Sequence, residues 1–166
     1  ADLLPISPYG ITKLAAEHLA YAYAGSFGLD VVVLRYFTVY GPRQRPDMAL
    51  APIVDALASG DAFELYGGGG QSRSFTFVSD VVDATVAAME RASRGAVYNV
   101  GGGEEVSIHD LAYRVRDTVG ANVAINWDAT KPDGAPRKLL DSRRLANVGW
   151  SPAMKLETGL RQAYAD

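Results

Sequence analysis

A tyrosine and a lysine four residues apart are the residues of this sequence whose types and spacing best suit proton chemistry. Tyr9 and Lys13 lie in the stretch Ser7-Pro8-Tyr9-Gly10-Ile11-Thr12-Lys13, and a spacing of four places two side chains on one face of a helix. A phenol is a poor base at neutral pH, but a nearby ammonium group favours the phenolate. The pair could therefore accept a proton from a hydroxyl group, although the same spacing also occurs by chance in helices without such a function.

Basic residues in expected loops and at expected strand ends form a second set of candidates. The ends of parallel strands and the loops that follow them are the usual ligand sites of α/β proteins. Two arginines that converge from separate loops can hold a diphosphate through bidentate hydrogen bonds, and Arg73 and Arg137 are the best candidates for this role. Solvated charges or structural ion pairs are the alternative for each basic residue. The full set is Arg35, Arg43, Arg45, Arg73, Arg137 and Lys138.

Composition excludes several other kinds of site. The 166 residues include no cysteine and two histidines, His18 and His109, so a thiolate nucleophile is excluded and a zinc site is not expected. A net charge of -3 argues against a binder of nucleic acid or of a membrane surface. Glycine runs occur at residues 67–70 and 101–103, but neither fits the spacing of a dinucleotide-binding loop. Both runs are interpreted as turns or points of close backbone approach.

Helix and strand patterns alternate along the chain and predict an α/β fold with part of a doubly wound parallel sheet. Ser7 is expected to cap a helix that begins at Pro8 and ends near residues 25–28, so Tyr9 and Lys13 would lie in its first turns. Further helices are expected at about residues 50–57, 81–91 (capped by Ser79 or Asp80), 108–119 (capped by Ser107), 142–147 and 156–164. Strands are expected at about residues 31–37, 63–66, 74–78, 96–100 and 123–127, and a polar loop at residues 131–138.

Several motifs, in order along the sequence, resemble the extended short-chain dehydrogenase/reductase family, specifically its nucleotide-sugar epimerases and dehydratases. The resemblance runs nearly from end to end of the chain and implies that Tyr9 and Lys13 belong to a catalytic site. The motifs are the stretch from Ser7 to Lys13, Arg35-Tyr36-Phe37-Thr38-Val39-Tyr40-Gly41-Pro42-Arg43-Gln44, Gln71-Ser72-Arg73-Ser74-Phe75-Thr76-Phe77-Val78, Tyr98-Asn99-Val100-Gly101 and Gly149-Trp150-Ser151-Pro152.

The resemblance implies part of a Rossmann-like doubly wound sheet together with a smaller α/β substrate-binding domain. Residues 1–48 would be the C-terminal remainder of the cofactor domain. Residues 49–166 would be mainly the nucleotide-sugar domain, with one strand and helix at about residues 75–100 returning to the sheet. The family's N-terminal dinucleotide-binding half, with its glycine-rich loop, acidic ribose-binding residue and catalytic serine or threonine, has no counterpart in the sequence. The chain is therefore expected to be truncated, to bind NAD weakly or not at all, and to be inactive in isolation.

The resemblance also implies roles for individual residues. Tyr9 would be the base that exchanges a proton with a sugar hydroxyl while hydride passes to or from NAD, with NADP as the alternative, and Lys13 would hold the nicotinamide ribose. Tyr36 and Phe37 would border the nicotinamide, and Thr38, where the family usually has asparagine, would face the sugar diphosphate. The residues implied to bind substrate are Thr38, Arg45, Tyr66, Arg73 and Arg137, with the strand at residues 63–66 along the nucleoside.

The leading hypothesis is an NAD-dependent 4-epimerase that acts on a UDP-sugar such as UDP-glucose or UDP-glucuronate. Arg43-Gln44-Arg45-Pro46-Asp47-Met48 is similar to the corresponding stretch of UDP-glucuronate and UDP-glucose 4-epimerases. Residues 131–141 are similar to GDP-fucose synthases, in which a histidine stands at the place of Arg43. The alternatives are a 4,6-dehydratase, a GDP-fucose-synthase-like reductase, a non-catalytic sugar-nucleotide-binding module, or a structural domain that pairs with a separate cofactor-binding chain.

A nucleotide diphosphate sugar is the expected partner, and neither nucleic acid nor a membrane is. A homodimer is a further option for a full-length form. The absence of cysteine and of a signal-like or membrane-spanning stretch predicts a cytoplasmic protein.

Overall fold

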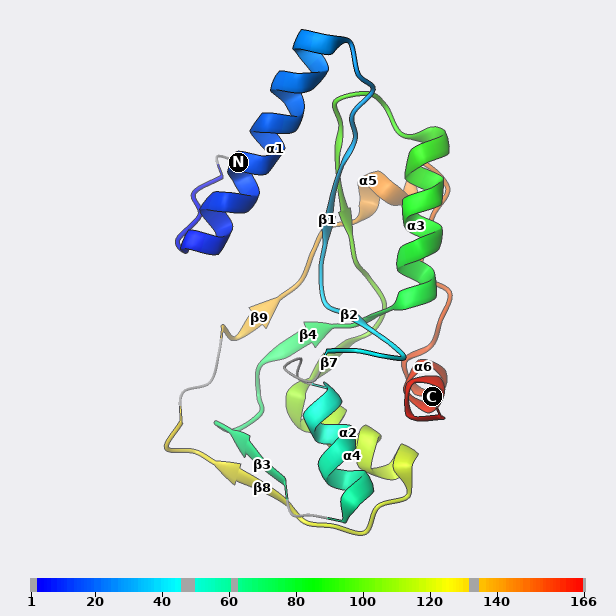
Figure 1. Cartoon of the computed structure of the whole chain (residues 1–166). Helices are drawn as coiled ribbons and strands as arrows, with labels where there is room; N and C mark the ends of the chain where they lie inside the picture. The colour runs from blue at the N-terminus through cyan, green and yellow to red at the C-terminus, as the bar shows by residue number, and fades with distance from the viewer. Residues whose placement is uncertain (1–2, 46–49, 61–62, 132–134, 166) are drawn as a thin grey trace.

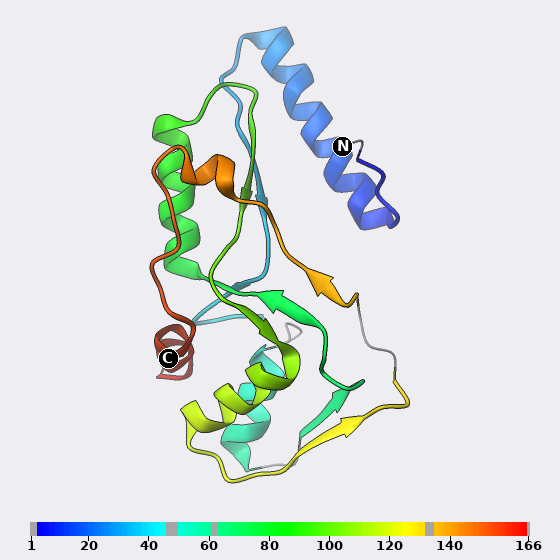
Figure 2. The same cartoon turned by 180° about the vertical axis from the view of Figure 1, so that it is seen from behind.

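Helices and strands divide between an upper and a lower part of an elongated molecule (Figures 1 and 2). The structure is a computed structural model, and it describes residues 3–45, 50–60, 63–131 and 135–165. The chain passes between the two parts several times, so each part is assembled from segments that lie far apart in the sequence. The division of the chain into two domains at residue 48 stays a prediction.

Two parallel strands form the centre of the upper part. Strands β1 (Val33–Tyr36) and β6 (Val97–Val100) pair so that the first residue of each lies opposite the first of the other. Helix α3 (Val78–Arg91) covers them with alanines, whose small side chains allow the helix to approach the strands closely, and the short α5 (Arg143–Ala146) adds a leucine. The buried cluster contains Ala84, Ala87, Ala88, Ala96, Tyr98, Val100, Leu145 and Trp150.

A second core fills the lower part. Strands β3 (Phe63–Tyr66) and β8 (Ile125–Asp128) pair in parallel, and helices α2 (Leu50–Ser59), α4 (Ile108–Val119) and α6 (Leu156–Ala165) pack beside them. The helices bury an apolar stripe, as expected for surface helices of a globular protein. The buried residues are Tyr40, Leu50, Ile53, Phe75, Phe77, Val106, Leu111, Val115, Leu156 and Leu160.

Short strands connect the two parts. Strands β2 (Val39–Tyr40) and β5 (Thr76–Phe77) pair in parallel directly below β1. Strand β4 (Ser72–Ser74) lies between β7 (Glu105–Ser107), which is antiparallel to it, and β9 (Arg137–Lys138), which is parallel to it. These pairings bring strand segments from residues 39–40, 72–77, 105–107 and 137–138 into the middle of the molecule.

Helix α1 (Pro8–Phe27) stands apart from the other elements in both ribbon views (Figures 1 and 2). It starts as the sequence predicts, because the Ser7 hydroxyl accepts a hydrogen bond from the Gly10 amide at 3.1 Å and proline suits the first helical position. It ends at Gly28, whose φ of 67° lies in the left-handed region that glycine favours. None of its residues is buried.

Most predicted elements are confirmed, including the helix that Ser7 caps and the helix that Ser107 caps. The cap predicted at Ser79 or Asp80 is wrong, because α3 begins three residues before Val81, at Val78, with Phe77 as its N-cap. Asp80 is instead buried, and its carboxylate accepts a hydrogen bond from the Met154 amide at 3.0 Å. The predicted loop at residues 131–138, of which residues 132–134 lie outside the described part of the chain, includes a short strand, β9. The strand predicted at residues 74–78 is divided between the end of β4 and β5, and it is wrong at Val78, where α3 begins. The sequence does not predict β2 and β7.

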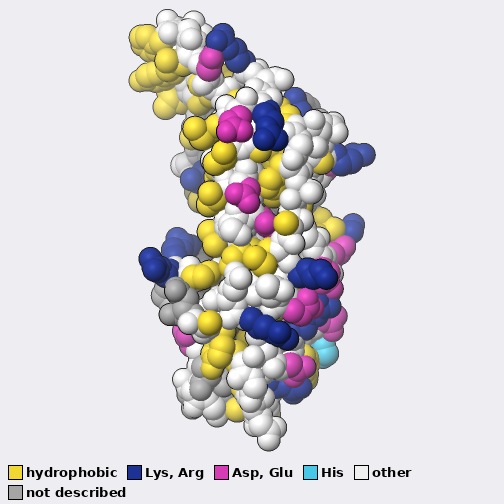
Figure 3. Space-filling model, turned by 90° about the vertical axis from the view of Figure 1, so that its right-hand side faces the viewer, with side chains coloured by type: hydrophobic (Ala, Val, Ile, Leu, Met, Phe, Trp, Pro, Cys, Tyr) yellow, Lys and Arg dark blue, Asp and Glu magenta, His cyan; other side chains and the backbone are white. Residues whose placement is uncertain are grey.

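Hydrophobic side chains are exposed on two helices of the upper part. Figure 3 shows them gathered over the end of α1 and over the outer face of α3. On α3 they lie at a helical spacing, at Val78, Val82, Val86 and Met89. Strand β1 has one hydrogen-bonded neighbour, β6, among the described residues, so its second edge carries backbone groups without a strand partner.

We expect the isolated chain to self-associate through the second edge of β1, because an uncovered strand edge is a template for pairing with another chain. A lysine on this edge opposes such pairing, so Val33→Lys should shift the chain from larger species towards the monomer in light scattering. Val82→Lys on the exposed face of α3 is the matched control and should leave the distribution unchanged. A wild-type chain that is a monodisperse monomer at high concentration contradicts the prediction.

Candidate functional site

The predicted shared face of Tyr9 and Lys13 is present on α1. The Nζ atom of Lys13 lies 5.3 Å from the centre of the Tyr9 ring, within reach of a favourable contact between a cation and an aromatic ring. Tyr9 is 71% exposed, so it is open to solvent. The first turn of the helix is held by the Ser7 cap and by the Thr12 hydroxyl, which donates to the Tyr9 carbonyl at 2.8 Å.

A cavity of about 720 Å³ lies between α1 and β1, and Tyr9 and Lys13 line it. The opposite wall is β1, from which Arg35 and Tyr36 reach the cavity. Of the predicted cofactor-binding residues, the structure therefore brings together Tyr9, Lys13 and Tyr36. Phe37 is not among the residues that line the cavity.

The segment that follows β1 is fixed by backbone hydrogen bonds. The Phe37 amide donates to the Val100 carbonyl at 3.0 Å, and the Thr38 carbonyl accepts from the Thr76 amide at 2.9 Å. Gly101 packs closely on Phe37, since a Cβ atom on this glycine would lie 3.1 Å from the Phe37 Cβ. This agrees with the close backbone approach expected at residues 101–103, and it holds Phe37 and Thr38 at the carboxyl end of β1.

Glu17 belongs to the same cavity, and sequence reasoning missed it. Its carboxylate accepts two hydrogen bonds from Arg35, from Nε at 2.7 Å and from one Nη at 2.6 Å. These hydrogen bonds lower the pKa of Glu17 and raise the pKa of Arg35. The available signal was spacing, because Glu17 lies four residues after Lys13 and therefore on the Tyr9 face. For Arg35 the structural ion pair, the alternative to ligand binding, is the one observed.

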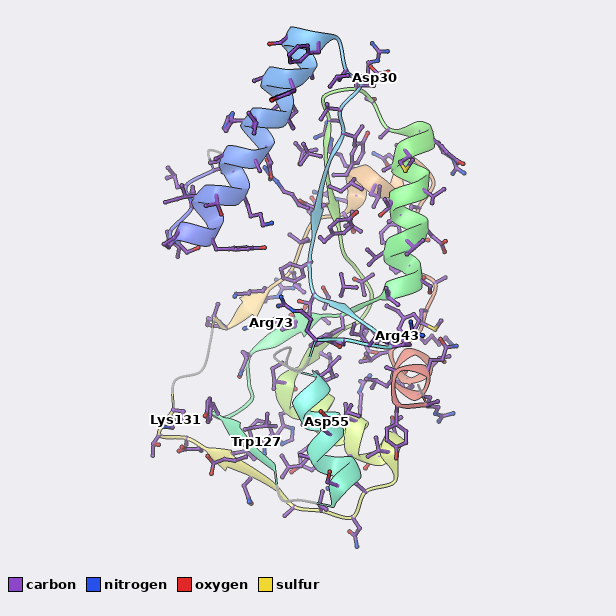
Figure 4. All side chains as sticks on the ribbon, in the orientation of Figure 1. Asp30, Arg43, Asp55, Arg73, Trp127 and Lys131 are labelled. Carbon is purple, nitrogen blue, oxygen red and sulfur yellow. The ribbon has the colours of Figure 1, made fainter. Side chains whose placement is uncertain are left out.

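The two arginines predicted to bind a diphosphate lie on neighbouring strands. Arg73 is in β4 and Arg137 in β9, and the register pairs Arg73 with Lys138. Figure 4 places Arg73 in the middle of the molecule, between its upper and lower parts. One Nη of Arg73 donates to the Ser72 carbonyl at 2.7 Å. Ser72 is the partner of Arg137 in this register, and successive residues of a strand point to opposite faces, so Arg73 and Arg137 lie on opposite faces of the sheet and their guanidinium groups are not brought together.

Arg137 is held by a carboxylate. Its Nε and one Nη donate to the two oxygens of Glu105, both at 2.8 Å. The guanidinium of Arg137, followed by the hydroxyl of Ser72, lowers the pKa of Glu105 to about 2. Both side chains are solvent-accessible, with 66% of Arg137 exposed, so an anionic ligand could replace Glu105 as the partner of Arg137.

Tyr66 and an aromatic group lie at the lower end of the molecule. The Tyr66 ring is 62% exposed, and the Nζ atom of Lys131 lies 5.8 Å from its centre. Trp127 stacks on His109 with ring centres 5.4 Å apart and packs against Gly69. Figure 4 shows Trp127 and Lys131 together beside β8, away from the cavity of Tyr9. The contact between Trp127 and His109 has no signal in the sequence, because their elements meet only in the folded chain.

Arg45 is an exposed residue in the loop after β2. It does not line the cavity between α1 and β1. Arg43, in the same loop, has a positive φ of 60°, which is uncommon for a residue other than glycine. The predicted role of Arg45 in substrate binding stays a prediction.

Metal-ligand clusters and membrane-spanning helices are both absent from residues 3–45, 50–60, 63–131 and 135–165. No group of three or more His, Asp or Glu side chains could hold a metal ion there. No helix in those residues is long and apolar enough to span a membrane.

Comparison with known proteins gives consistent relatives. Residues 1–101 match the NAD dependent epimerase/dehydratase family. The chain is 35% identical to a Bacillus subtilis (strain 168) protein named uncharacterized UDP-glucose epimerase YtcB, over 99% of this chain and 52% of that protein. It is also 35% identical to GDP-L-fucose synthase 1 of Arabidopsis thaliana, over 94% of this chain and 51% of that protein.

A solved structure with the same fold is UDP-glucuronic acid 4-epimerase from Bacillus cereus in complex with UDP-glucuronic acid and NAD. The TM-score is 0.87 at 37% identity, and the match covers 98% of this chain and 52% of that chain. The chain therefore has the α/β fold of Rossmann-like epimerases, as the sequence predicted. It spans about half the length of the relatives that it matches.

We predict that acid weakens the corner formed by β4, β7 and β9. The pKa of Glu105 falls from 4.5 to about 2 on folding, so its pair with Arg137 stabilises the fold above about pH 5 and this contribution is lost as the pH falls towards 2. The urea midpoint of the wild type should therefore drop more between pH 6 and pH 3 than that of Glu105→Gln. Glu64→Gln removes an exposed carboxylate on β3 and is the control, whose urea midpoint should fall as much as that of the wild type. Equal falls of the midpoint in the wild type and Glu105→Gln contradict the prediction.

Proposed function

The chain belongs to the NAD-dependent epimerase/dehydratase family, and we propose that it is the catalytic-tyrosine and substrate-binding part of a nucleotide-sugar 4-epimerase that acts on a UDP-sugar. The observation that carries the proposal is the cavity between α1 and β1. In it Tyr9 and Lys13 share one wall, and Tyr36 lies on the other. A base, its cation and an aromatic side chain thus face one space.

The residues of this cavity fit the nicotinamide end of NAD. Lys13 offers an ammonium group that can donate hydrogen bonds to ribose hydroxyls, and the half-exposed ring of Tyr36 offers a flat surface for a planar group. Bound there, NAD would supply the hydride acceptance and donation that oxidation and re-reduction of the sugar carbon require. The relatives with solved structures include NAD complexes, which supports this cofactor.

Tyr9 carries the proton transfer in this proposal. As a phenolate, its oxygen accepts the proton of the C4 hydroxyl while the C4–H bond gives up its hydride, so the hydroxyl becomes a carbonyl and Tyr9 a neutral phenol. In the return step the phenol gives the proton back to the sugar oxygen. Tyr9 therefore starts and ends the cycle in the same state.

The diphosphate and nucleoside are assigned to the middle and lower parts of the molecule. Arg73 and Arg137 lie on adjacent strands but on opposite sheet faces, so each is a candidate contact for a phosphate by itself, and the exposed Tyr66 supplies a ring face for a base. Thr38 would approach the sugar from the end of β1, and Arg45 from the loop after β2. Arg137 would exchange Glu105 for a phosphate oxygen, so binding replaces one anionic partner with another.

A GDP-sugar reductase is the second candidate. It is supported by the identity of 35% with GDP-L-fucose synthase 1. It is weakened by Arg43, which stands where those synthases have a histidine for acid and base chemistry. The two candidates differ in the nucleotide that the protein prefers, which a binding measurement separates.

We predict that the isolated chain binds UDP-glucuronate or UDP-glucose more tightly than GDP-sugars in calorimetry. Arg73→Ala should weaken this binding by about tenfold to a hundredfold, since a hydrogen bond to a charged group is worth roughly 1.5–3 kcal/mol. Arg94→Ala, whose ion pair with Asp30 lies in the upper part, is the control. Tighter binding of GDP-sugars favours the reductase, and micromolar binding of NAD by this chain contradicts the expectation of weak cofactor binding.

We further predict that Tyr9→Phe abolishes epimerisation. The test uses a chimera in which this chain replaces the matching half of the Bacillus cereus enzyme, so that a cofactor-binding half is present. Loss of the base should lower turnover by about 10²-fold or more while UDP-sugar affinity changes little. Tyr23→Phe, on the same helix and also exposed, should keep wild-type turnover. Turnover that persists in Tyr9→Phe removes Tyr9 from the proposed role.

A further inference from the structure

Few contacts fix the position of helix α1 relative to the rest of the molecule. None of its residues is buried, and in Figures 1 and 2 it stands away from both cores. Packing of an apolar stripe, which normally fixes a helix, therefore supplies little. Within the described residues, the side-chain hydrogen bonds that join α1 to β1 are the two between Glu17 and Arg35.

The ion pair of Glu17 and Arg35 has a geometry that can orient a helix. Two parallel N–H···O bonds of 2.7 and 2.6 Å join the planar guanidinium to the planar carboxylate, and such a fork restrains direction as well as distance. The side chains of Arg35 and Glu17 are 33% and 16% exposed, so solvent screens the pair less than an ordinary surface ion pair. The lowered pKa of Glu17 agrees with a carboxylate that stays charged near neutral pH.

The pair lies at the point where orientation matters for Tyr9 and Lys13. Glu17 follows Lys13 by one helical turn on the same face, and Arg35 precedes Tyr36 in β1. A connection at this point fixes both the rotation of α1 and its height along β1. It thereby sets how Tyr9 and Lys13 face Tyr36 across the cavity.

We propose that Glu17 and Arg35 are positioning residues, whose ion pair holds the Tyr9 and Lys13 face of α1 in register with the end of β1. The consequence for catalysis rests on the function proposed above. The effect on the placement of α1 does not, and it is measured without turnover. Replacing one partner with a neutral side chain leaves the other as an unpaired, half-buried charge. The helix then loses its restraint, and solvation of the unpaired charge favours its movement.

The absence of cysteine allows a direct test. Spin labels are attached to cysteines at two exposed positions, Ala15→Cys on α1 and Asp83→Cys on α3, and the distance between them is measured by double electron–electron resonance. In the wild-type background we expect one narrow distance peak. In Glu17→Gln we expect a broad distribution with a shifted mean, and an unchanged narrow peak overturns the proposal.

Two further variants separate pairing from a general loss of structure. Glu104→Gln removes a bidentate partner of Arg114 far from α1 and should keep the narrow peak. The exchange Glu17→Arg with Arg35→Glu restores opposite charges and should narrow the distribution again, whereas a swap that stays broad contradicts pairing as the cause. Circular dichroism tests whether each variant keeps its helix content. Any variant that does not fold is replaced by Arg35→Lys, which keeps the positive charge but cannot form the two parallel hydrogen bonds of a guanidinium group, so it should also broaden the distance distribution.

The chimera adds a kinetic readout. Glu17→Gln should lower kcat and leave KM for the UDP-sugar unchanged, because the residue acts on the orientation of Tyr9 and not on substrate binding. The label distances of Tyr9→Phe should remain those of the wild type. A failure of the proposed function therefore shows in turnover, and a failure of the positioning role shows in the distances.

Discussion

The parallel pairing of β1 with β6 is the constraint on which the rest of the structure depends. It joins residues 33–36 to residues 97–100, so everything between them must leave the upper part and return to it. Parallel strands need such a crossover, and here it contains β2, α2, β3, β4 and β5 before α3 closes it. The same pairing places Tyr36, Phe37 and Thr38 at a strand end beside Gly101, where α/β proteins present side chains to ligands.

Two tyrosines of this chain show how burial separates structural from chemical use. Tyr40 is 2% exposed, and burial raises its pKa, so its phenol stays protonated and donates to the Leu156 carbonyl at 3.4 Å. Its ring packs on Phe77 at a centre distance of 5.3 Å and leaves no room for a side chain at Gly159. Tyr9 has the opposite surroundings, with open solvent, a cation and a cavity. The same phenol is a core anchor in one place and an exposed group that lines a cavity in the other.

Local signals in the sequence predict α1, α4 and the central strands, because caps, periodicity and β-branched runs act over a few residues. The serine caps at Ser7 and Ser107 and the strand in residues 31–37 are examples. Long-range partners decide what was missed. Aspartate is a common helix cap, but the carboxylate of Asp80 accepts a hydrogen bond from the amide of Met154, 74 residues later in the chain. Strand β9 forms by pairing with β4. The residues of the 131–138 segment alone do not predict this pairing. Candidate residues followed from motifs, whereas the partners of Arg35 and Arg137 required the fold.

Those two arginines occupy ion pairs of similar geometry and different surroundings, and the surroundings decide what each pair can do. Arg137 and Glu105 meet in solvent, where water can solvate either partner and exchange with an anion costs little. Arg35 and Glu17 are half-buried, so separating them would expose two charges to a region with less water. The first pair therefore suits a site that must open for a ligand. The pair of Arg35 and Glu17 suits a contact that persists while a ligand changes. Helix α1, which has no buried side chains, needs such a contact if Tyr9 is to keep one position relative to β1.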